Sequence, residues 1–588
     1  MARKFLRPSA LAACRAGIVA LSVLPLLAGL APWHHSSQAG PVGYSGIFTT
    51  VSGFELLPAA MPGSHAFRPE QVGQSTRGMV SSFQPLATDA GRLMLQQGGN
   101  AVDAAVATAF ALAVVEPSMS SLGGRTQIMI RRPSGEHVAI DGGTQVPLTY
   151  DGPTDSETDT PPGYQTIAIP GTVAALAQAQ QLYGSKSLAE VTAPAINYAR
   201  NGFVLNSAEA SRIASAANDL FPAARGYFLK PNGTPHAAGE TLIQTDLAAV
   251  LTAIATDGPD AFYKGWIAQR ISQDMHANGG YITPAELHNY TAKPATQVTT
   301  NYRGYTLTGI FRPASGHSTI EALNIMGLFD MSACAPNASW ASITHQALLR
   351  AINDADTSPG GTDDESAAIL TSNSHAQQRS QDMTDDCPRL AATPGSGSGR
   401  PQAVQDPPGT TSLATADDHG GIVALTQSIG PNMGSQVVTP GLGFLWASTM
   451  GYIDSTPGSR PRTGQTPMIV EKNRQFVLAL GGAGGKKIVP AVVETLTRVI
   501  DEDLPLADAV AAPRLYSAAP TTIEIEDDAA QGVHWPDAVL SDLQDMGYTL
   551  KRKSSSSFGR VAALSYDAAK GVYIGVTDPR VNGSVAGP

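Results

Sequence analysis

The sequence predicts a mixed α/β protein with a substantial packed core, and three observations support this prediction. Hydrophobic residues make up 42% of the 588 residues and charged residues only 15%, which excludes global disorder. Segments with helical and with strand patterns follow one another along the chain and are not segregated into halves. The 59 glycines and 42 prolines indicate many turns between these segments. A chain of this length could form several small domains or one large α/β body with insertions.

The charge balance and the N-terminus bear on partners and location. Lys and Arg number 38 against 49 Asp and Glu, and the net charge of −11 without a basic run in the mature chain argues against nucleic acid as a binding partner.

An export signal is predicted at residues 1–39, because basic residues precede an apolar stretch at 16–31, and Ser37 and Ala39 offer a cleavage site before Gly40. An uncleaved anchor is the alternative, although the apolar run falls short of the roughly 20 residues that span a bilayer. We expect a periplasmic or secreted protein.

Predicted strands and helices are mixed along the first part of the mature chain, after an irregular leader. Strands are predicted at 78–82, 126–131, 138–141 and 305–307, and the second and third form a hairpin that turns at Gly135. Helices are predicted at 87–97, 101–115, 173–183, 189–201, 245–256, 262–275, 283–288, 319–329 and 342–352. Asn100 and Asp103 open the Ala-rich helix that ends at Val115, and we interpret them as helix caps and not as catalytic groups.

Residues 354–408 interrupt this pattern. They contain Pro359-Gly360-Gly361, a Gly-Ser repeat at 395–399 and Pro407-Pro408, with few large apolar residues. We predict a flexible segment that ends where Thr410 begins. Beyond it, strands are predicted at 413–416, 422–428, 468–471, 476–480, 560–566 and 571–576, and helices at 489–500, 506–511 and 535–546.

The junction of Gly409 and Thr410 is a candidate self-cleavage point at the start of a strand. Cleavage there would give Thr410 a free α-amine beside its own hydroxyl. Such an amine can act as the general base for that hydroxyl, because its unperturbed pKa lies near neutrality. An ordinary linker followed by an ordinary strand is the alternative, and the Gly-Thr-Thr sequence alone would favour it. The rest of the chain decides between the two.

The cysteines and histidines give little indication of a metal or a cofactor. Cys14 would leave with the signal, and Cys334 and Cys387 then form an even pair in an exported chain, so a disulfide is an open alternative to two free thiols. No Cys/His cluster has metal-ligand spacing, which argues against a zinc site. We expect neither a metal nor a cofactor.

Several short motifs occur in an order that resembles one known family. They are GGNAVDAA at 98–105, LGG at 122–124, PGTVA at 170–174, YRGY at 302–305, PxSG at 313–316 and DPR at 578–580. Together they resemble the gamma-glutamyltransferases, exported N-terminal-nucleophile hydrolases that are made as one chain and cut into two subunits. The resemblance implies an αββα four-layer sandwich. It also implies a large subunit of residues 40–409, including the flexible segment, and a small subunit of 410–588.

The resemblance assigns the catalytic groups residue by residue. It places the nucleophile at Thr410, the cut between Gly409 and Thr410, and a second hydroxyl eighteen residues further on, at Ser428. Gly484 and Gly485 correspond to the glycine pair whose backbone N–H groups stabilise the oxyanion. Glycine suits this task because no Cβ keeps the backbone away from the intermediate. A simple turn at 481–485 is the less favoured alternative.

The departures from the family pattern fall on substrate recognition. Gly143 stands where the family has an arginine for the substrate α-carboxylate, and Gly451 stands where it has an acidic residue for the α-amine. Thr463 and Gly464 replace a pair of serines that also bind substrate. Two further differences are Ser412 in place of a histidine and Gly430 in place of an asparagine. Glycine cannot imitate a bidentate arginine–carboxylate contact.

Arg125 is the residue that could supply the missing cation. It follows Gly123-Gly124, where the family has more glycines, and a solvent-facing arginine at a hairpin start is at least as well supported. We therefore predict a self-processing amidohydrolase or acyltransferase that acts on gamma-glutamyl or related amide bonds of small molecules or peptides. An acylase of non-glutamyl amides and an exported binding or structural homologue without activity are the alternatives.

Overall fold

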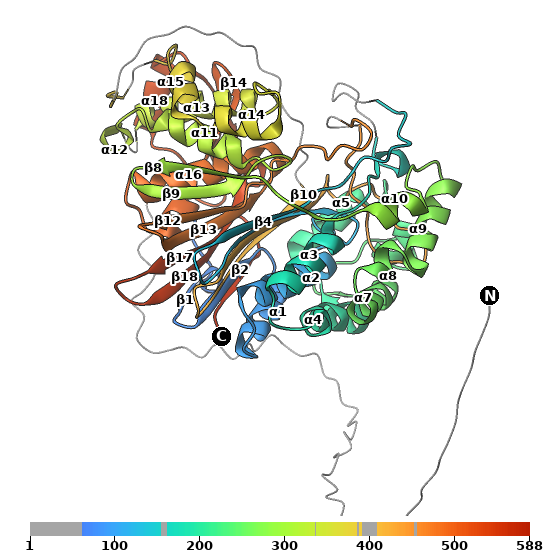
Figure 1. The fold of residues 1–588 in the computed structure, drawn as a ribbon. Coiled ribbons are helices and arrows are strands. Elements are labelled where there is room, and N and C mark those ends of the chain that lie inside the picture. The colour runs from blue at the N-terminus through green and yellow to red at the C-terminus, as the bar shows by residue number, and fades with distance from the viewer. Residues whose placement is uncertain (1–61, 154–160, 335–336, 385–386, 391–408, 452–454) are drawn as a thin grey trace, which may run out of the picture. The chain divides into compact units, whose positions relative to one another are not determined.

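A computed structural model describes residues 62–153, 161–334, 337–384, 387–390, 409–451 and 455–588 (Figure 1). Two antiparallel seven-stranded sheets form its centre. The first sheet runs in the order β1 (Val72–Ser75), β18 (Val572–Thr577), β17 (Arg560–Asp567), β13 (Gln475–Ala483), β12 (Met468–Lys472), β9 (Tyr305–Ile310), β8 (Gln297–Tyr302). The second runs in the order β19 (Ser584–Ala586), β2 (Gly78–Ser82), β10 (Gly409–Asp417), β11 (Ile422–Gly430), β3 (Arg125–Arg131), β4 (His137–Gly142), β7 (Lys293–Pro294).

Helices cover the outer face of each sheet (Figure 1). The helices beside the second sheet are α1 (Pro85–Gln96), α2 (Ala101–Val115), α3 (Thr172–Tyr183), α4 (Leu188–Asn201), α5 (Ser207–Ala216), α6 (Pro222–Phe228), α7 (Thr245–Asp257), α8 (Asp260–Tyr263), α9 (Trp266–Ala277) and α10 (Pro284–Asn289). Those beside the first sheet are α11 (Gly316–Met326), α12 (Met331–Cys334), α13 (Ala338–Asp354), α14 (Asp363–Leu370), α15 (Asn373–Arg379), α16 (Ile488–Ile500), α17 (Leu506–Ala511) and α18 (Asp537–Asp545). A small sheet of β14 (Leu515–Ala519), β15 (Thr522–Glu526) and β16 (Thr549–Lys553) and a pair β5 (Phe203–Val204) and β6 (Thr241–Leu242) complete the fold.

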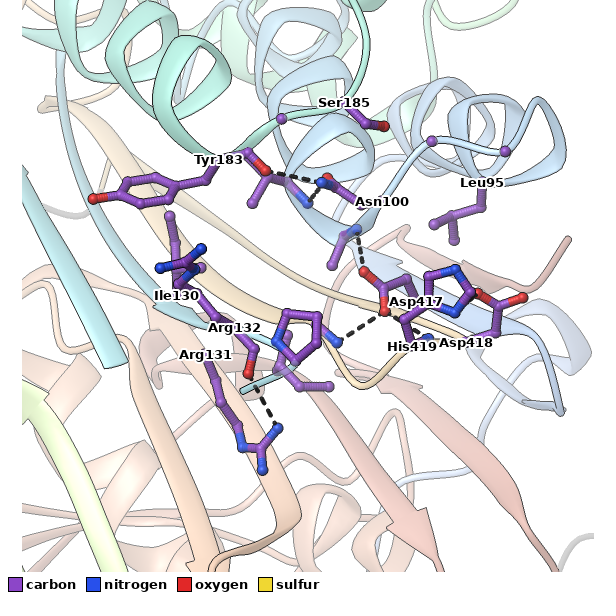
Figure 2. A pocket seen from close by; sticks show the side chains of 18 of the residues that line it. Leu95, Asn100, Ile130, Arg131, Arg132, Tyr183, Ser185, Asp417, Asp418 and His419 are labelled. Carbon is purple, nitrogen blue, oxygen red and sulfur yellow. Dashed lines mark hydrogen bonds and ion pairs between the residues drawn. The ribbon is translucent and has the colours of Figure 1, made fainter. Parts of the chain in front are cut away.

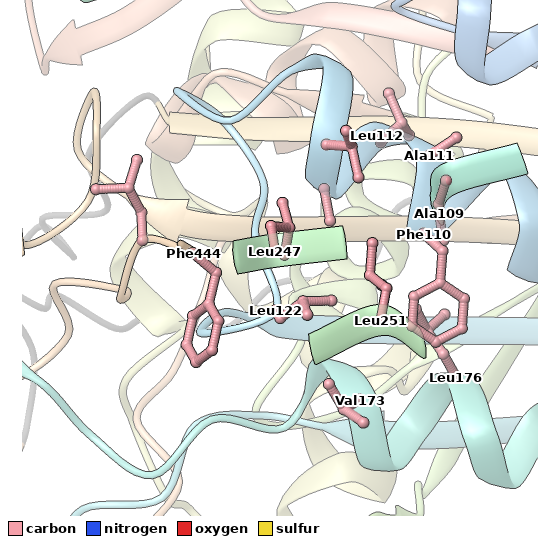
Figure 3. Close-up of a cluster of buried hydrophobic side chains, with 14 of the residues drawn as sticks. Ala109, Phe110, Ala111, Leu112, Leu122, Val173, Leu176, Leu247, Leu251 and Phe444 are labelled. Carbon is pink, nitrogen blue, oxygen red and sulfur yellow. The ribbon is translucent and has the colours of Figure 1, made fainter. Parts of the chain in front are cut away.

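Three apolar clusters separate these four layers. One cluster joins the second sheet to its helices, another joins the first sheet to α11, α13 and α16, and a thinner one with Ala414 and Ala479 lies between the sheets. Figure 3 shows part of the first cluster, to which α2 contributes Phe110 and Leu112, α3 contributes Val173 and Leu176, and α7 contributes Leu247 and Leu251. The predicted αββα sandwich is confirmed.

Helix α2 illustrates how the sequence produces this arrangement. All fifteen of its residues are buried, as expected for a helix that is apolar on every side. The Asn100 side chain accepts hydrogen bonds from the backbone N–H groups of Val102 and Asp103, and the Asp103 carboxylate accepts one from Asn100 N. Both residues therefore cap the helix, as predicted.

Two predictions about local structure are wrong in part. The segment predicted to be flexible from residue 354 contains α14 and α15, because Thr362 and Ser372 cap these helices and Leu370 and Ala376 bury against the core. The helix predicted at 262–275 is two helices, α8 and α9, separated at Gly265.

Cys334 and Cys387 form a disulfide with a Cα–Cα distance of 5.9 Å, which settles the alternative that the sequence left open.

Some predictions concern residues outside the described part of the chain. The export signal at 1–39 and the remainder of the predicted flexible segment at 391–408 are among them. Within the residues that are described, no helix is both long and apolar enough to cross a membrane.

Candidate active site

The first residues of β10 place the predicted nucleophile inside the second sheet. β10 lies between β2 and β11, and Thr410 pairs with Ser428 in antiparallel register. The register shifts by one residue between Gly409 and Thr410. Both hydroxyl side chains are buried, with Thr410 3% and Ser428 1% exposed. The eighteen-residue spacing read from the sequence therefore corresponds to a direct cross-strand pair.

A chain of hydrogen bonds links the two hydroxyls to the carbonyl group of the predicted scissile bond. Thr410 Oγ1 donates to Ser428 Oγ over 3.0 Å, and Ser428 Oγ donates to the Gly409 carbonyl oxygen over 2.7 Å. The Gly430 N–H donates to Ser428 Oγ over 3.0 Å. Ser428 thus uses its single proton and both lone pairs. Its hydroxyl polarises the Gly409 carbonyl while it orients the neighbouring Thr410 hydroxyl.

The face of β10 that carries Thr410 points toward the other sheet. A Cβ added to Gly481 of β13 would lie 2.5 Å from Ser412 Oγ and 2.9 Å from Thr426 Oγ1, so glycine allows the sheets to approach here. Ser412 is two residues from Thr410 and shares its face. Ala414, two residues further along, belongs to the same cluster between the sheets as Ala479. The end of β13 that leads to Gly484 and Gly485 therefore lies toward the Thr410 end of β10.

Gly484 and Gly485 have a backbone conformation that a side chain would strain. Their φ angles are +129° and +61°, and Gly485 opens a short 3-10 turn (Gly485–Lys487) that leads into α16. Within the described residues, neither amide N–H donates to a backbone carbonyl outside that turn. N–H groups just before a helix carry partial positive charge and suit an oxyanion.

Arg125 lies in the same cross-strand row as the two hydroxyls. On β3 it pairs with Ser428, which in turn pairs with Thr410, so the three side chains share one face of the sheet. Arg125 is only 1% exposed. The alternative of a solvent-facing arginine is therefore wrong, whereas a role in substrate binding stays a prediction.

A second arginine, which the sequence analysis missed, lies beside Gly143. A Cβ on Gly143 would be 2.9 Å from Asp141 Oδ1 and 3.5 Å from Arg460 Cδ, so little space is left for a side chain. The Arg460 guanidinium donates to Asp141 Oδ2 over 2.7 Å and lies over the Tyr290 ring. Burial opposes ionisation of Arg460, but Tyr290 and Asp141 outweigh it and raise the pKa of this guanidinium. Asp141 and Arg460 are 319 positions apart in the chain, so sequence reasoning did not detect this pair.

The remaining predicted substrate-binding residues lie at a small cavity and a turn. Thr463 and Gly464 line a hollow of about 40 Å³ together with Ser315, Lys486 and Val489. Ser315 Oγ donates to the Thr463 carbonyl over 2.7 Å, which fixes this loop to the start of α11. Gly451 is buried with φ +84°, a conformation that favours glycine at this position.

Glu116, at the end of α2, is a further buried charge that sequence reasoning did not select. Burial raises the pKa of the Glu116 carboxyl, and Arg212, whose Nη1 lies 3.3 Å away, together with the Thr411 hydroxyl acts against this shift. The sequence carried a signal in Glu116, a charged residue that directly follows the long buried helix α2.

A larger cavity of about 540 Å³ lies away from these groups (Figure 2). It is lined by Asn100, Arg131, Tyr183 and Asp417, and the Ala101 N–H donates to Asp417 Oδ2 over 2.9 Å. Asp417 ends β10, whereas Thr410 stands near its beginning, about 23 Å away at roughly 3.3 Å per residue. This cavity is separate from the hydroxyl pair.

Comparison with known proteins relates the chain to a described family. The family profile described as Gamma-glutamyltranspeptidase matches residues 87–588. The glutathione hydrolase proenzyme of Bacillus subtilis (strain 168) is 30% identical over 602 residues, covering 96% of this chain and 97% of that protein. The acylase ACY 1 proenzyme of Pseudomonas sp. (strain V22) is 32% identical over 485 residues, covering 78% and 85%. The crystal structure of cephalosporin acylase from Bacillus halodurans matches with a TM-score of 0.77 and 26% identity, covering 91% and 99%.

Proposed function

Because the chain belongs to the gamma-glutamyltranspeptidase family, we propose that it is a self-processing amidohydrolase or acyltransferase with Thr410 as its nucleophile. The observation that carries this proposal is the hydrogen-bonded chain from Thr410 through Ser428 to the Gly409 carbonyl. A homologue without activity would have no reason to keep a buried, hydrogen-bonded hydroxyl pair at this junction. The arrangement of Thr410, Ser428 and the Gly409 carbonyl suits two successive reactions, self-cleavage and then acyl transfer.

The first reaction is self-cleavage. Thr410 Oγ1 attacks the Gly409 carbonyl carbon while its proton passes to Ser428 Oγ and the Ser428 proton passes to the Gly409 oxygen. When the tetrahedral intermediate collapses, the C–N bond breaks, the Thr410 nitrogen takes up a proton, and Gly409 becomes an ester on Thr410 Oγ1. Water hydrolyses this ester, releasing the Gly409 carboxylate and a free Thr410. The products are a large chain that ends at Gly409 and a small chain of residues 410–588.

The second reaction is acyl transfer from an amide substrate. The α-amine of Thr410 accepts the proton of its own hydroxyl, and Oγ1 attacks the amide carbon. The Gly484 and Gly485 N–H groups, at the start of the turn before α16, stabilise the oxyanion. The amine product leaves with the proton, and water or an acceptor amine then releases the acyl group.

The acyl group is proposed to be a gamma-glutamyl group or a related carboxylate-bearing one. Arg125 is the candidate for its carboxylate, because this buried guanidinium shares a sheet face with Thr410 and Ser428. The relative named glutathione hydrolase supports a gamma-glutamyl donor, and the relative named acylase supports a donor with another acyl group. Export to the periplasm or the medium is proposed from the N-terminal signal at residues 1–39.

Intact mass and N-terminal sequencing of the purified protein test this proposal. We expect two chains, with the smaller one beginning at Thr410, and hydrolysis in a panel of gamma-glutamyl and other amides. A single uncut mature chain that hydrolyses no amide in the panel would refute it.

A further inference from the structure

Three ionisable side chains from three helices converge on one point of the helical layer beside the first sheet. Glu321 comes from the middle of α11, Asp354 from the last residue of α13, and His375 from α15. Their ligand-type atoms all lie within 4.8 Å of one another. The His375 Nε2 atom is 3.1 Å from Glu321 Oε1 and 3.1 Å from Asp354 Oδ2.

The hydrogen bonds that His375 makes cannot satisfy all of the oxygen atoms in this cluster. One imidazole nitrogen carries at most one proton, so His375 Nε2 has a single N–H for two carboxylates. Glu321 is completely buried, and its Oε2 atom has no hydrogen-bond partner. A buried carboxylate oxygen without a partner is costly and calls for a specific explanation.

The distances within the cluster match those around a first-row metal ion. Histidine nitrogen and carboxylate oxygen bind zinc at about 2.0–2.2 Å. Two such ligands, at angles of about 90–110° around one ion, are about 3.0–3.4 Å apart. Both distances from His375 Nε2 fall in this range. Side-chain exposures of 14% for His375 and 13% for Asp354 leave a route for an ion from solvent.

We propose that Glu321, Asp354 and His375 form a binding site for one divalent transition-metal ion, with Zn²⁺ as the probe ion. The imidazole nitrogen and one oxygen of each carboxylate supply three ligands, and water completes the coordination. The site ties α15 to α11 and α13 and is structural. The sequence pattern of clustered Cys and His did not reveal it, because Glu321 and His375 are 54 positions apart in the chain.

Arg379 is the competitor for this ion. Its Nε atom lies 2.7 Å from Asp354 Oδ2 without the alignment of a hydrogen bond. A guanidinium at this distance disfavours a second cation. Removing its charge is therefore expected to strengthen metal binding, whereas a purely structural ion-pair network would only lose stability.

Metal titration of the full-length protein, stripped with a chelator, tests the proposal without reference to cleavage or activity. We expect one equivalent of Zn²⁺ by calorimetry and a higher melting temperature on binding. Glu321→Gln and His375→Gln should each lower the affinity for this Zn²⁺ ion on the order of 100-fold, and Arg379→Gln should raise it. His419→Gln is the matched control, because His419 is 79% exposed and pairs only with its neighbour Asp418 among the described residues.

Three results would overturn the metal site. The first is that the protein binds no Zn²⁺ in a saturable way. The second is that both Glu321→Gln and His375→Gln still bind one Zn²⁺ ion with unchanged affinity. The third is that Arg379→Gln binds Zn²⁺ more weakly than the unaltered protein. Loss of the equivalent in the His419→Gln control would show adventitious binding and would also refute the proposal. Since Glu321→Gln preserves the shape of the side chain, a folded variant is available even if His375→Gln unfolds.

Discussion

Replacing Ser428 by alanine should separate self-cleavage from folding. The substitution removes one oxygen that makes three hydrogen bonds, to Thr410 Oγ1, Gly409 O and Gly430 N. The most important of these for cleavage is the hydrogen bond that Ser428 donates to the Gly409 carbonyl oxygen, because negative charge develops on this oxygen during attack. Loss of one such donor typically reduces a rate by about 10²–10³-fold. The same substitution should lower the free energy of unfolding by only about 1–3 kcal/mol.

The assay follows the conversion of purified precursor into two chains by intact mass over time, beside a thermal melt. Ser412→Ala is the matched control. Its hydroxyl lies two residues from Thr410 on the same face of β10 and donates to the Leu425 carbonyl over 3.0 Å. It should lose comparable stability and cleave at close to the rate of the unaltered protein. Equal cleavage rates for Ser428→Ala and the unaltered protein would refute the role assigned to Ser428.

Three further predictions address the nucleophile, the specificity and the acid stability. Thr410→Ala should fold but remain one inactive chain, whereas Thr410→Ser should cleave slowly; mass analysis that finds Thr410→Ala cut normally would disprove the assignment. Matched glutamyl and glutaryl amides, which differ only in the α-amine, should show comparatively better kcat/KM for glutaryl, because Gly451 carries no charge for that amine; a clear glutamyl preference that Arg125→Ala abolishes would contradict this expectation. Burial lowers the pKa of His345 to about 4, so its contribution to stability is complete above about pH 6.5 and is lost as the pH falls to about 4. His345→Gln should flatten the pH dependence of unfolding in that range by about 3 kcal/mol, and an unchanged profile would show that His345 is not responsible.

Local patterns were enough to predict the elements whose information lies within a few residues. Helix α17 has the predicted bounds, and α2 begins at its predicted cap, because side-chain oxygens and apolar periodicity act over short distances. The strand β8 was missed, since its sequence is polar and its burial alternates at an edge of the sheet. Helix α14 was missed although Thr362 and Glu365 form a capping box, because the surrounding glycines and prolines outweighed that signal.

Some features of the candidate site could likewise be predicted from local sequence, and others could not. The spacing of Thr410 and Ser428 is a property of one hairpin, so the sequence contains it. The burial of Arg125 and the pairing of Arg460 with Asp141 depend on strands and loops that meet only in the folded protein. The sequence shows that these residues are charged, but only the folded structure shows that Arg125 is buried and that Arg460 pairs with Asp141.

The order of strands in the two sheets has a consequence for the refolding of the protein after the proposed cut. The second sheet combines strands from the two sides of the Gly409–Thr410 bond, since β2 lies between β19 and β10, and β11 lies next to β3. The first sheet has segments from the large chain at both of its edges. The Cys334–Cys387 disulfide would not join the two proposed products, because both cysteines precede the proposed cut.

An uncut precursor can therefore refold as a single molecule, whereas the cut protein has to bring together two separate chains that are interleaved in both sheets. Refolding of the cut form would be second order and would compete with aggregation of exposed strand edges. The native state of the cut protein would then persist because it unfolds slowly and not because it reforms readily. A single broken bond would turn a reversible folding equilibrium into a one-way process.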